Sequence, residues 1–383
     1  MWEKKDDRLV VVEPCGSYDE KEVWHSLSRV LEPLGGLAWV REGMTIVIKA
    51  NLVTFAKPEE AATTHPALLC ALVKMLKDRG ARVIVGDSPG GLYNSAYVGR
   101  IYRATGMERV REAGAELNED FGQASAQAPQ SRVLHDFVYT SYLDRADVII
   151  DFCKLKTHGM MGMSAAAKNM FGVIPGTVKP EYHFRFPNPT DFARMIVDLD
   201  EYFAPRLCIA DAVVGMEGNG PTQGTPRKIG ALVASCSPHA LDLVCAHLIG
   251  LAPENVPTLL AARERDLIPA DWHELPVVGD VEALVIPDYG NIAVRSSLVF
   301  DHRSKFFGWL ARRNLESRPA VSLPDCRGCG KCAQICPAQA IAMVKGKPHI
   351  QRKTCIRCFC CQEFCPFGAM EVHRPLVARM LNR

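Results

Sequence analysis

The 383-residue sequence lacks any apolar run near the roughly 18–20 residues that a membrane-spanning helix needs. It also lacks an excess of one charge, since 45 Lys and Arg stand against 43 Asp and Glu, and nothing in this balance favours nucleic acid as a partner. The first eight residues contain no apolar segment behind their basic residues and so lack the pattern of a secretory signal peptide. These absences predict a cytoplasmic protein with no transmembrane segment and no nucleic-acid partner.

Cysteine is scarce in most of the chain and concentrated at its C-terminal end. Residues 1–325 hold six cysteines, whereas the last 58 residues hold nine. Disulfides are rare in the reducing cytoplasm. Clustered cysteines in such a protein are typical of metal or cluster binding.

The C-terminal cysteines contain one spacing twice, at an offset of 29 residues. The two copies read Cys326-x2-Cys329-x2-Cys332-x3-Cys336-Pro337 and Cys355-x2-Cys358-x2-Cys361-x3-Cys365-Pro366. A structural zinc site needs only two Cys-x2-Cys pairs and would leave the third cysteine and the Cys-Pro of each copy unexplained. Cys360 falls outside the repeat, and we expect it to pack rather than to bind metal.

This repeat, over residues 322–374, resembles the bacterial-type ferredoxins that hold two [4Fe–4S] clusters. The resemblance implies a small α+β ferredoxin-like domain in which the last cysteine of each copy binds the cluster of the other copy. It assigns one cluster to Cys326, Cys329, Cys332 and Cys365, and the second to Cys355, Cys358, Cys361 and Cys336.

A basic segment precedes the cysteine repeat. Residues 302–318, HRSKFFGWLARRNLESR, have the pattern of a short amphipathic helix, which we interpret as a linker helix within residues 301–321. Residues 324–383 carry ten Lys and Arg against three Asp and Glu. A docking face for an acidic redox partner protein, or for an anionic membrane surface, is the alternative interpretation.

The long N-terminal part, residues 1–300, alternates apolar strand patterns with helix patterns. The expected strands are 9–12, 45–50, 82–86, 148–152, 207–210 and 229–235, and the expected helices are 20–31, 66–78, 191–202, 240–249 and 255–264. Short apolar runs without alternation are typical of strands buried on both faces. This order predicts an α/β domain with a mainly parallel sheet, followed by the ferredoxin-like domain at 322–383.

Polar side chains follow four of the expected strands. They are Asn51, then Asp87 and Ser88, then Lys154, Lys156 and His158, and finally Asp211 and Glu217. Ligands bind at the carboxyl ends of the strands in open α/β sheets, so we place a functional cleft there. The alternative is that some of these residues are ordinary loop residues and helix caps.

The chemistry of these residue types suggests their roles. Lys154 and Lys156, with Lys168 brought in by a short helix, are suited to an anionic group. His158 is the candidate general acid, because an unperturbed histidine pKa lies near neutrality. Asp87, Asp211 and Glu217 are suited to orienting a substrate or binding a divalent cation. Three of these residues, His158, Lys156 and Lys168, are the catalytic candidates.

The N-terminal part also resembles a family known as domain-of-unknown-function family 362, over about residues 45–290. The resemblance is carried by the following segments: 48–51 (IKAN), 63–66 (TTHP), 86–88 (GDS), 154–158 (KLKTH), 168–172 (KNMFG), Asp211 and 215–218 (GMEG). Members of that family often occur with ferredoxin-type cluster domains. The resemblance implies a fold and an association with redox chemistry, and it implies no reaction.

Several common enzyme motifs are missing. There is no Gly-x4-Gly-Lys-Ser/Thr phosphate loop and no His-Glu-x-x-His zinc helix. Residues 86–90 spell the Gly-x-Ser-x-Gly elbow, but Pro89 has no N–H to offer an oxyanion hole, so Ser88 is not expected to be a nucleophile. A bound flavin is compatible with the sequence, because flavin sites often lack a short sequence signature.

Together these patterns predict an iron–sulfur oxidoreductase. Two [4Fe–4S] clusters would pass electrons to an anionic substrate or a cofactor bound in the cleft of the α/β domain. Two alternatives remain: an electron carrier whose large domain recognises a partner protein, and an accessory factor that reductively activates a metallocofactor elsewhere.

Overall fold

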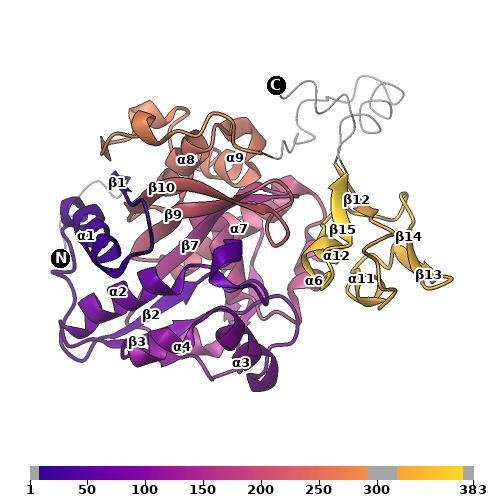
Figure 1. Cartoon of the computed structure of the whole chain (residues 1–383), viewed down its shortest axis with the longest axis horizontal. Helices are drawn as coiled ribbons and strands as arrows, with labels where there is room; N and C mark the ends of the chain where they lie inside the picture. Colours follow the sequence, from indigo (N-terminus) through magenta and orange to yellow (C-terminus); the bar gives the residue numbers. More distant parts are fainter. Residues whose placement is uncertain (1–7, 292–316, 374–383) are drawn as a thin grey trace.

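The computed structural model describes residues 8–291 and 317–373. A large α/β domain and a small ferredoxin-like domain lie against each other, the small domain at one side of the large one (Figure 1). None of the helices described in these two ranges is long and apolar enough to cross a lipid bilayer.

The α/β domain is organised around one nine-stranded sheet. Its strands run in the order β11-β1-β10-β9-β7-β2-β3-β4, and β8 pairs with the far end of β7. Neighbours from β9 to β4 are parallel, while β10 is antiparallel to both β1 and β9, so the predicted mainly parallel α/β fold is confirmed. The strands are β1 (Val10–Pro14), β2 (Thr45–Ala50), β3 (Arg82–Gly86), β4 (Glu116–Leu117), β7 (Val148–His158), β8 (Gly162–Ser164), β9 (Leu207–Glu217), β10 (Thr225–Ser235) and β11 (Val277–Val278). A separate hairpin joins β5 (Gln123–Gln127) to β6 (Asp136–Thr140).

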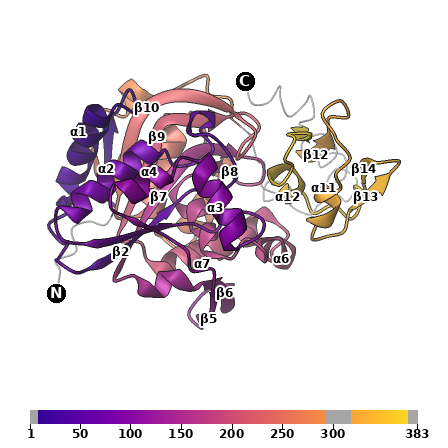
Figure 2. The same ribbon diagram turned by 60° about the horizontal axis from the view of Figure 1, so that its bottom comes forward.

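Helices cover both faces of the sheet. One face packs against α1 (Glu20–Leu31), α2 (Pro66–Lys77), α3 (Ser95–Ala104) and α4 (Glu108–Glu112). The other packs against α5 (Ala166–Asn169), α7 (Pro189–Phe203), α8 (Pro238–Leu248) and α9 (Pro257–Arg263). Local sequence determines where several of these helices begin. Asp19 caps α1 by accepting from two backbone N–H groups, and Asn188 caps α7 just before Pro189. The remaining helix of this domain, α6 (Lys179–Arg185), lies on the side of the ferredoxin-like domain (Figure 2).

Two strands continue through segments where the sequence predicts loops. We expected loops after Phe152 and after Ala210, but β7 continues to His158 and β9 to Glu217. The expectation failed because charged residues in a short stretch suggest a loop, whereas here they alternate with buried apolar residues. Alternate residues of a strand point to opposite faces, so one face can be polar while the other is core.

The ferredoxin-like domain consists of two small antiparallel sheets and two short helices. β12 (Arg318–Val321) pairs with β15 (Met370–His373), and β13 (Ile341–Val344) pairs with β14 (Lys347–Ile350). The helices are α11 (Lys331–Gln334) and α12 (Cys360–Glu363). The prediction that the linker helix extends to residue 321 is wrong, because Arg318–Val321 forms hydrogen bonds with β15. Residues 302–316 of the predicted helix lie outside the described residues.

The small domain has a near side and a far side. Figures 1 and 2 both place α12 next to the α/β domain and the β13–β14 hairpin farthest from it.

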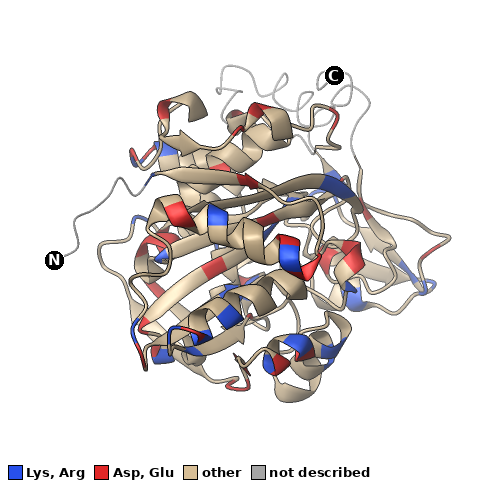
Figure 3. Cartoon of the chain, turned by 60° about the vertical axis from the view of Figure 1, so that its left-hand side comes forward, with Lys and Arg blue, Asp and Glu red and all other residues tan. Residues whose placement is uncertain are grey.

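Lys and Arg are interspersed with Asp and Glu along the α/β-domain helices that face the viewer in Figure 3.

Candidate functional site

The polar face of β7 carries the lysines and the histidine singled out by sequence. Lys154, Lys156 and His158 point to one face, while Cys153 and Leu155 pack into the core on the other. All three polar side chains are at least 98% buried. They therefore need partners, and each has a different one.

Lys154 forms a closed ion pair deep in the domain. Its Nζ lies 2.9 Å from Oδ2 of Asp211 and 2.9 Å from the hydroxyl oxygen of Tyr18. The Tyr18 hydroxyl donates to Oδ1 of the same carboxylate, and the backbone N–H of His65 donates to Oδ2. Lys154 and Asp211 are thus satisfied by each other, and neither lines the cavity described below.

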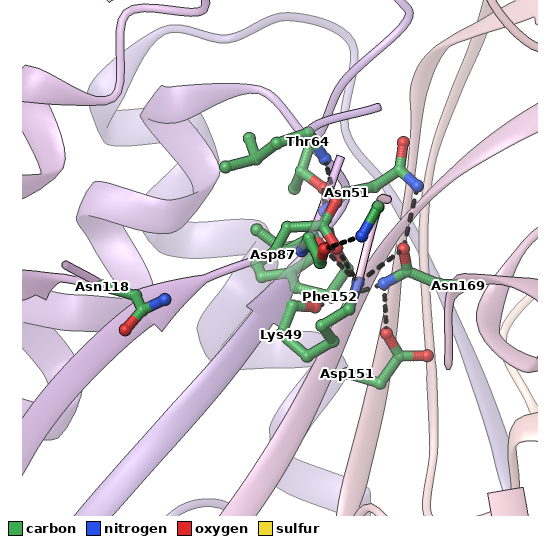
Figure 4. A network of polar contacts seen from close by, with 12 residues as sticks. Lys49, Asn51, Thr64, Asp87, Asn118, Asp151, Phe152 and Asn169 are labelled. Carbon is green, nitrogen blue, oxygen red and sulfur yellow. Dashed lines mark hydrogen bonds and ion pairs between the residues drawn. The ribbon is translucent and has the colours of Figure 1, made fainter. Parts of the chain in front are cut away.

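A second polar network holds Lys156 in place, and Figure 4 labels three of its members, Asn51, Asn169 and Asp151. The Nζ of Lys156 donates to Oδ1 of Asn51 at 2.8 Å and to the carbonyl of Ala62 at 2.7 Å. The amide of Asn51 donates to Oδ1 of Asn169 at 2.8 Å, and the amide of Asn169 donates to Asp151. Two amide side chains therefore fix one lysine through oriented hydrogen bonds.

The same network contains a buried ion pair between Asp87 and Lys49, a residue that was not among the predicted site residues. Nζ of Lys49 lies 2.6 Å from Oδ1 of Asp87, and both side chains are buried. The other oxygen of Asp87 accepts from the backbone N–H of Leu52 at 2.7 Å. Gly172 passes so close that a Cβ there would lie 2.4 Å from Oδ1 of Asp87. This pair holds three loops together at the carboxyl ends of the strands.

A cavity of about 730 Å³ opens at this edge of the sheet, between the two domains. The α/β domain contributes Asn51, Asp87, Ser88, Lys156, His158 and Lys168, all of them predicted site residues. The ferredoxin-like domain contributes Cys360, Glu363, Phe364 and Cys365 to the opposite wall. The predicted strand-end cleft thus exists, but the cluster domain forms one of its walls.

Four lysines line the cavity, Lys331 from the ferredoxin-like domain and three from the α/β domain. Burial lowers the pKa of Lys156 to about 7, with a further lowering by the nearby charge of Lys168. Burial also lowers the pKa of Lys168, whose Nζ has no hydrogen bond or ion pair within the described residues and lies 4.9 Å from the ring centre of Phe171. Lys179, which our sequence analysis missed, has its pKa lowered by burial to about 7, and its Nζ donates to the carbonyl of Ser88. These are sites for an anion, because a bound negative charge would restore the lost solvation.

His158 faces a carboxyl group of the other domain. Its Nδ1 accepts from the backbone N–H groups of Met160 and Met161, so Nε2 carries the proton. Nε2 lies 3.3 Å from Oε1 of Glu363, and neither atom completes a hydrogen bond within the described residues. Burial lowers the pKa of His158 well below its usual value and raises that of Glu363. The imidazole is therefore neutral, and a pKa near neutrality, our reason for choosing it as general acid, does not hold in this environment.

Glu363 was not singled out by sequence, although the repeat contains a signal for it. It occupies the position of Gln334 in the other copy, 29 residues earlier, so a charge appears at that position in the second copy alone. Lys179 had no comparable signal, because it lies 11 residues beyond Lys168 at the start of a short helix.

Aromatic and apolar side chains form the mouth of the cavity. Phe55 and Tyr97 meet edge to face with ring centres 4.9 Å apart, and the guanidinium of Arg100 lies 5.1 Å from the Phe55 ring centre. Leu92, also at the mouth, is 57% exposed. The cavity is thus cationic inside and aromatic at its opening, which suits an organic anion with an apolar body.

Direct contacts hold the two domains together around this cavity. The amide of Gln362 donates to the carbonyl of Asn219 at 2.9 Å, and the amide of Gln223 donates back to the carbonyl of Gln362 at 2.7 Å. The backbone N–H of Val372 donates to Oδ1 of Asn219 at 3.1 Å. Gly90 lies against the Phe364 ring, where a Cβ would come within 2.7 Å of Cζ. The cavity wall is therefore held by hydrogen bonds and close packing.

The structure sorts the eight repeat cysteines into two neighbourhoods. Four of them line one small cavity of about 20 Å³, namely Cys326, Cys329, Cys332 and Cys365. Cys336 lies close enough to Cys355 and Cys361 to perturb their thiols electrostatically, and Cys358 is next to both. In each group the last cysteine of one copy joins the first three of the other. Eight thiols in two such sets fit the donor chemistry of two [4Fe–4S] clusters.

The backbone of this domain repeats with the same offset as its cysteines. Left-handed conformations occur at Gly328 and Gly330 in the first loop and at Arg357 and Phe359 in the second. Such conformations cost a non-glycine residue free energy, so their repetition in the second loop indicates that the loop shape is required. Cys360, which follows Phe359, is buried, lies within hydrogen-bonding distance of Cys358 and lines the large cavity.

The predicted acidic residues do not converge. Asp87 pairs with Lys49, Asp211 pairs with Lys154, and Glu217 accepts from the backbone N–H of Gly290 at 2.9 Å. Within residues 8–291 and 317–373, no three His, Cys, Asp or Glu side chains form a group suited to a single metal ion. The divalent-cation interpretation of these three residues is therefore wrong, since each already has a separate partner.

One curated protein and two solved structures are similar to this chain. The Thylakoid-associated protein sll1697 of Synechocystis sp. (strain PCC 6803) is 32% identical over 257 residues, which cover 65% of this chain and 76% of that protein. Among solved structures, the lactate racemase apoprotein from Thermoanaerobacterium thermosaccharolyticum has 12% identity and a TM-score of 0.38, over 63% of this chain and 59% of that one. A Thermotoga maritima protein has 16% identity and a TM-score of 0.37, over 61% of this chain and 59% of that one. The chain thus spans 59% of the length of each of these solved structures.

Family models match both parts of the chain. One described as a domain of unknown function (DUF362) matches residues 46–247, and one described as a 4Fe-4S dicluster domain matches residues 318–366. The two resemblances inferred from the sequence are confirmed. Because the first match covers more than half of the chain, the protein belongs to the DUF362 family, and it carries a ferredoxin-type iron–sulfur domain at its C-terminal end.

Proposed function

We propose that the protein is an iron–sulfur reductase whose substrate is a small organic anion bound in the cavity between the two domains. The observation that carries this proposal is the composition of the cavity walls. One wall holds Lys156, Lys168 and Lys179, and the opposite wall holds Cys365, a cluster ligand by the ferredoxin pattern. A molecule bound there touches both the anion-binding groups and the electron-transfer domain.

The residues of the chain have separable tasks in this reduction. Lys168, which has no hydrogen bond or ion pair in the part of the chain that the structure describes, attracts the negative group of the substrate. Lys156 is held by Asn51 and the Ala62 carbonyl, so its position changes little when substrate binds. Phe55 and Tyr97 at the mouth contact the apolar body and keep water out. Binding is therefore oriented, with the charge inward and the apolar part outward.

Reduction by two electrons also needs two protons, and the cavity has groups suited to supply them. The clusters provide single electrons. Lys156 and Lys179, whose pKa values lie at about 7, hold transferable protons at physiological pH. His158 offers the Nε2 hydrogen of a neutral imidazole, which can stabilise negative charge growing on a substrate oxygen. We assign catalytic roles to Lys156 and His158 and a binding role to Lys168.

Reoxidation of the reduced protein by small molecules tests this proposal. Anaerobically prepared protein is reduced with dithionite, freed of excess reductant and mixed with aromatic anions that accept electrons, such as cinnamate and phenylpyruvate. Cinnamamide serves as the uncharged control. We expect the oxidised cluster absorbance to return when an anion of this class is added. This reoxidation should slow in Lys168→Gln. It should be unaffected in the control variant Lys21→Gln, which changes an exposed residue of α1.

The carrier hypothesis predicts a different outcome. If no organic anion reoxidises the clusters, while a protein acceptor does so equally well in wild type and Lys168→Gln, the cavity takes no part in electron transfer. That result would make the large domain a recognition module, and the reductase proposal would be abandoned.

A further inference from the structure

The two cluster-binding loops differ in their surroundings. In the second loop, Cys358 and Cys361 are buried, and the adjoining Phe359 contacts Gly159 of the α/β domain. In the first loop, Cys329 is exposed and Cys326 is half-buried. The second loop therefore packs on the α/β domain, and the first-loop cluster site opens outward at Cys329, although its ligand Cys365 also lines the interdomain cavity.

Apolar side chains surround the outward site. Leu323 is 58% exposed, Phe367 48% and Val344 54%, and Met343 beside them is 37% exposed. Met343 and Phe367 line the small cavity formed by the four cysteines. These are four of the ten large apolar side chains exposed within the described residues, although this domain contributes only residues 317–373. Such a concentration is typical of a binding surface.

The same face is basic. Arg327 and Lys331 line the small cysteine cavity, and Lys345 is at the tip of the β13–β14 hairpin next to it. None of these three has an ion pair within the described residues, and all are exposed. Lys347 donates to the carbonyls of Leu323 and Cys326, which ties the hairpin to the first loop. Over residues 317–373 there are eight Lys and Arg and three Asp and Glu, and one of the three, Glu363, faces the interdomain cavity instead.

We propose that this face, formed by Arg327, Lys345, Leu323, Met343 and Phe367 around Cys329, docks an acidic one-electron carrier protein that reduces the outward cluster. One electron leaves the reduced carrier and enters the cluster held by the first loop. The carrier is oxidised by one electron, and no bond is made or broken. From this cluster the electron can pass to a molecule in the interdomain cavity, which the ligand Cys365 of the same cluster lines.

Charge and geometry together select this kind of partner. An apolar centre with a basic rim matches an acidic protein that carries its redox group near its surface, and opposite charges raise the rate of encounter. Electron transfer needs close approach, and the exposed cysteine provides it. An anionic membrane would also be attracted to such a face, so the test must distinguish membrane binding from binding of the carrier protein.

Binding and electron transfer can be measured with reduced flavodoxin, a small acidic flavoprotein, as the probe. The test variant is Arg327→Glu/Lys345→Glu in the full-length, cluster-loaded protein. The control is Lys77→Glu/Arg79→Glu, which changes the net charge equally at the end of α2, at the opposite edge of the sheet. Iron content is measured for both, so that cluster loss is not mistaken for lost docking.

We expect the test variant to raise the Kd for flavodoxin at least tenfold at low salt, and to lower the second-order rate of cluster reduction by about 10–10³-fold. Wild type should bind more weakly as salt rises, and the test variant should show a much shallower salt dependence. The control variant should match wild type in both measurements.

Two results would overturn the proposal. Equal effects of the test and control variants would show that only overall charge matters. Loss of binding to phosphatidylglycerol vesicles in the test variant, with unchanged flavodoxin binding, would assign the face to a membrane. The docking proposal does not rest on the reductase proposal, because dithionite reduces the clusters without docking and small-molecule reoxidation can be measured separately.

Discussion

His158 and Glu363 face each other across the boundary between the two domains, with Nε2 and Oε1 3.3 Å apart. His158 ends a strand of the α/β domain, and Glu363 lies two residues from Cys361 and from Cys365. Neither atom has a complete hydrogen bond within the described residues, although both are buried. A bound molecule that accepts from Nε2 would satisfy one of them.

The first prediction concerns His158 itself. His158→Ala should keep both clusters, because no cysteine is changed, and should slow reoxidation by substrate about 10²–10³-fold, as loss of a buried donor does. Because burial holds the pKa of His158 well below its usual value, any inflection of the rate near pH 7 should come from Lys156 and Lys179 and should persist in His158→Ala. Stopped-flow absorbance between pH 5.5 and 9 measures both. An unchanged rate in the variant would remove His158 from the mechanism.

The second prediction contrasts two lysines of the same strand-end region. Lys168→Met removes a partly desolvated charge that has no polar partner among residues 8–291 and 317–373, so the free energy of unfolding should rise by about 1 kcal/mol. Lys154→Met leaves Asp211 buried without its partner, so the free energy of unfolding should fall by about 3–5 kcal/mol. Denaturant unfolding of both variants checks this. A loss of stability in Lys168→Met would show that its charge is structurally required.

The third prediction is a pH dependence of anion binding. In the free protein Lys156 and Lys179 lose their protons as the pH rises through about 7. An anion prefers the protonated lysines, so binding should be constant below that pH and should weaken above it. We expect the Kd of 2-naphthoate, measured calorimetrically, to rise by up to ~10-fold per pH unit for each proton taken up.

Two controls accompany this measurement. The uncharged 2-naphthamide should show no pH dependence, because it gains nothing from a charged lysine. Lys156→Met should make the rise of log Kd with pH less steep, because one of the two lysines that take up a proton is missing. A Kd for 2-naphthoate that stays constant from pH 6 to pH 9 would contradict the assignment of the lysines as the anion site.

The fourth prediction separates cluster ligands from a neighbouring cysteine. Anaerobically made protein should contain about eight iron and eight acid-labile sulfide, because eight thiolates hold two cubanes. Cys329→Ser should lose one cluster or both, whereas Cys360→Ser should keep all the iron. Iron and sulfide analysis with electron paramagnetic resonance of the reduced protein checks this. Iron loss from Cys360→Ser would show that the register of the ligands is wrong.

Much of the fold and of the cluster domain follows from short-range patterns. The cysteine spacing predicts the ferredoxin-like domain because each loop is short and its ligands are neighbours in sequence. Strand β2 and helix α1 have the bounds that the apolar patterns predicted. The polar run after Phe152 was misread as a loop, because its alternation becomes meaningful only when the neighbouring strands supply partners.

The sequence by itself determined the two domain types. It also supplied the eight candidate cluster ligands and the lysine and histidine candidates of β7. Only the tertiary structure decided which candidates lie together in one cavity. It separated Lys154 and Asp211, which satisfy each other, from Lys156 and Lys168, and it added Lys179 and Glu363. The physical reason is that the cavity is formed by the order of strands in the sheet and by the packing of one domain on the other. Neither the strand order nor the domain packing leaves a periodic pattern in the sequence of the residues that line the cavity.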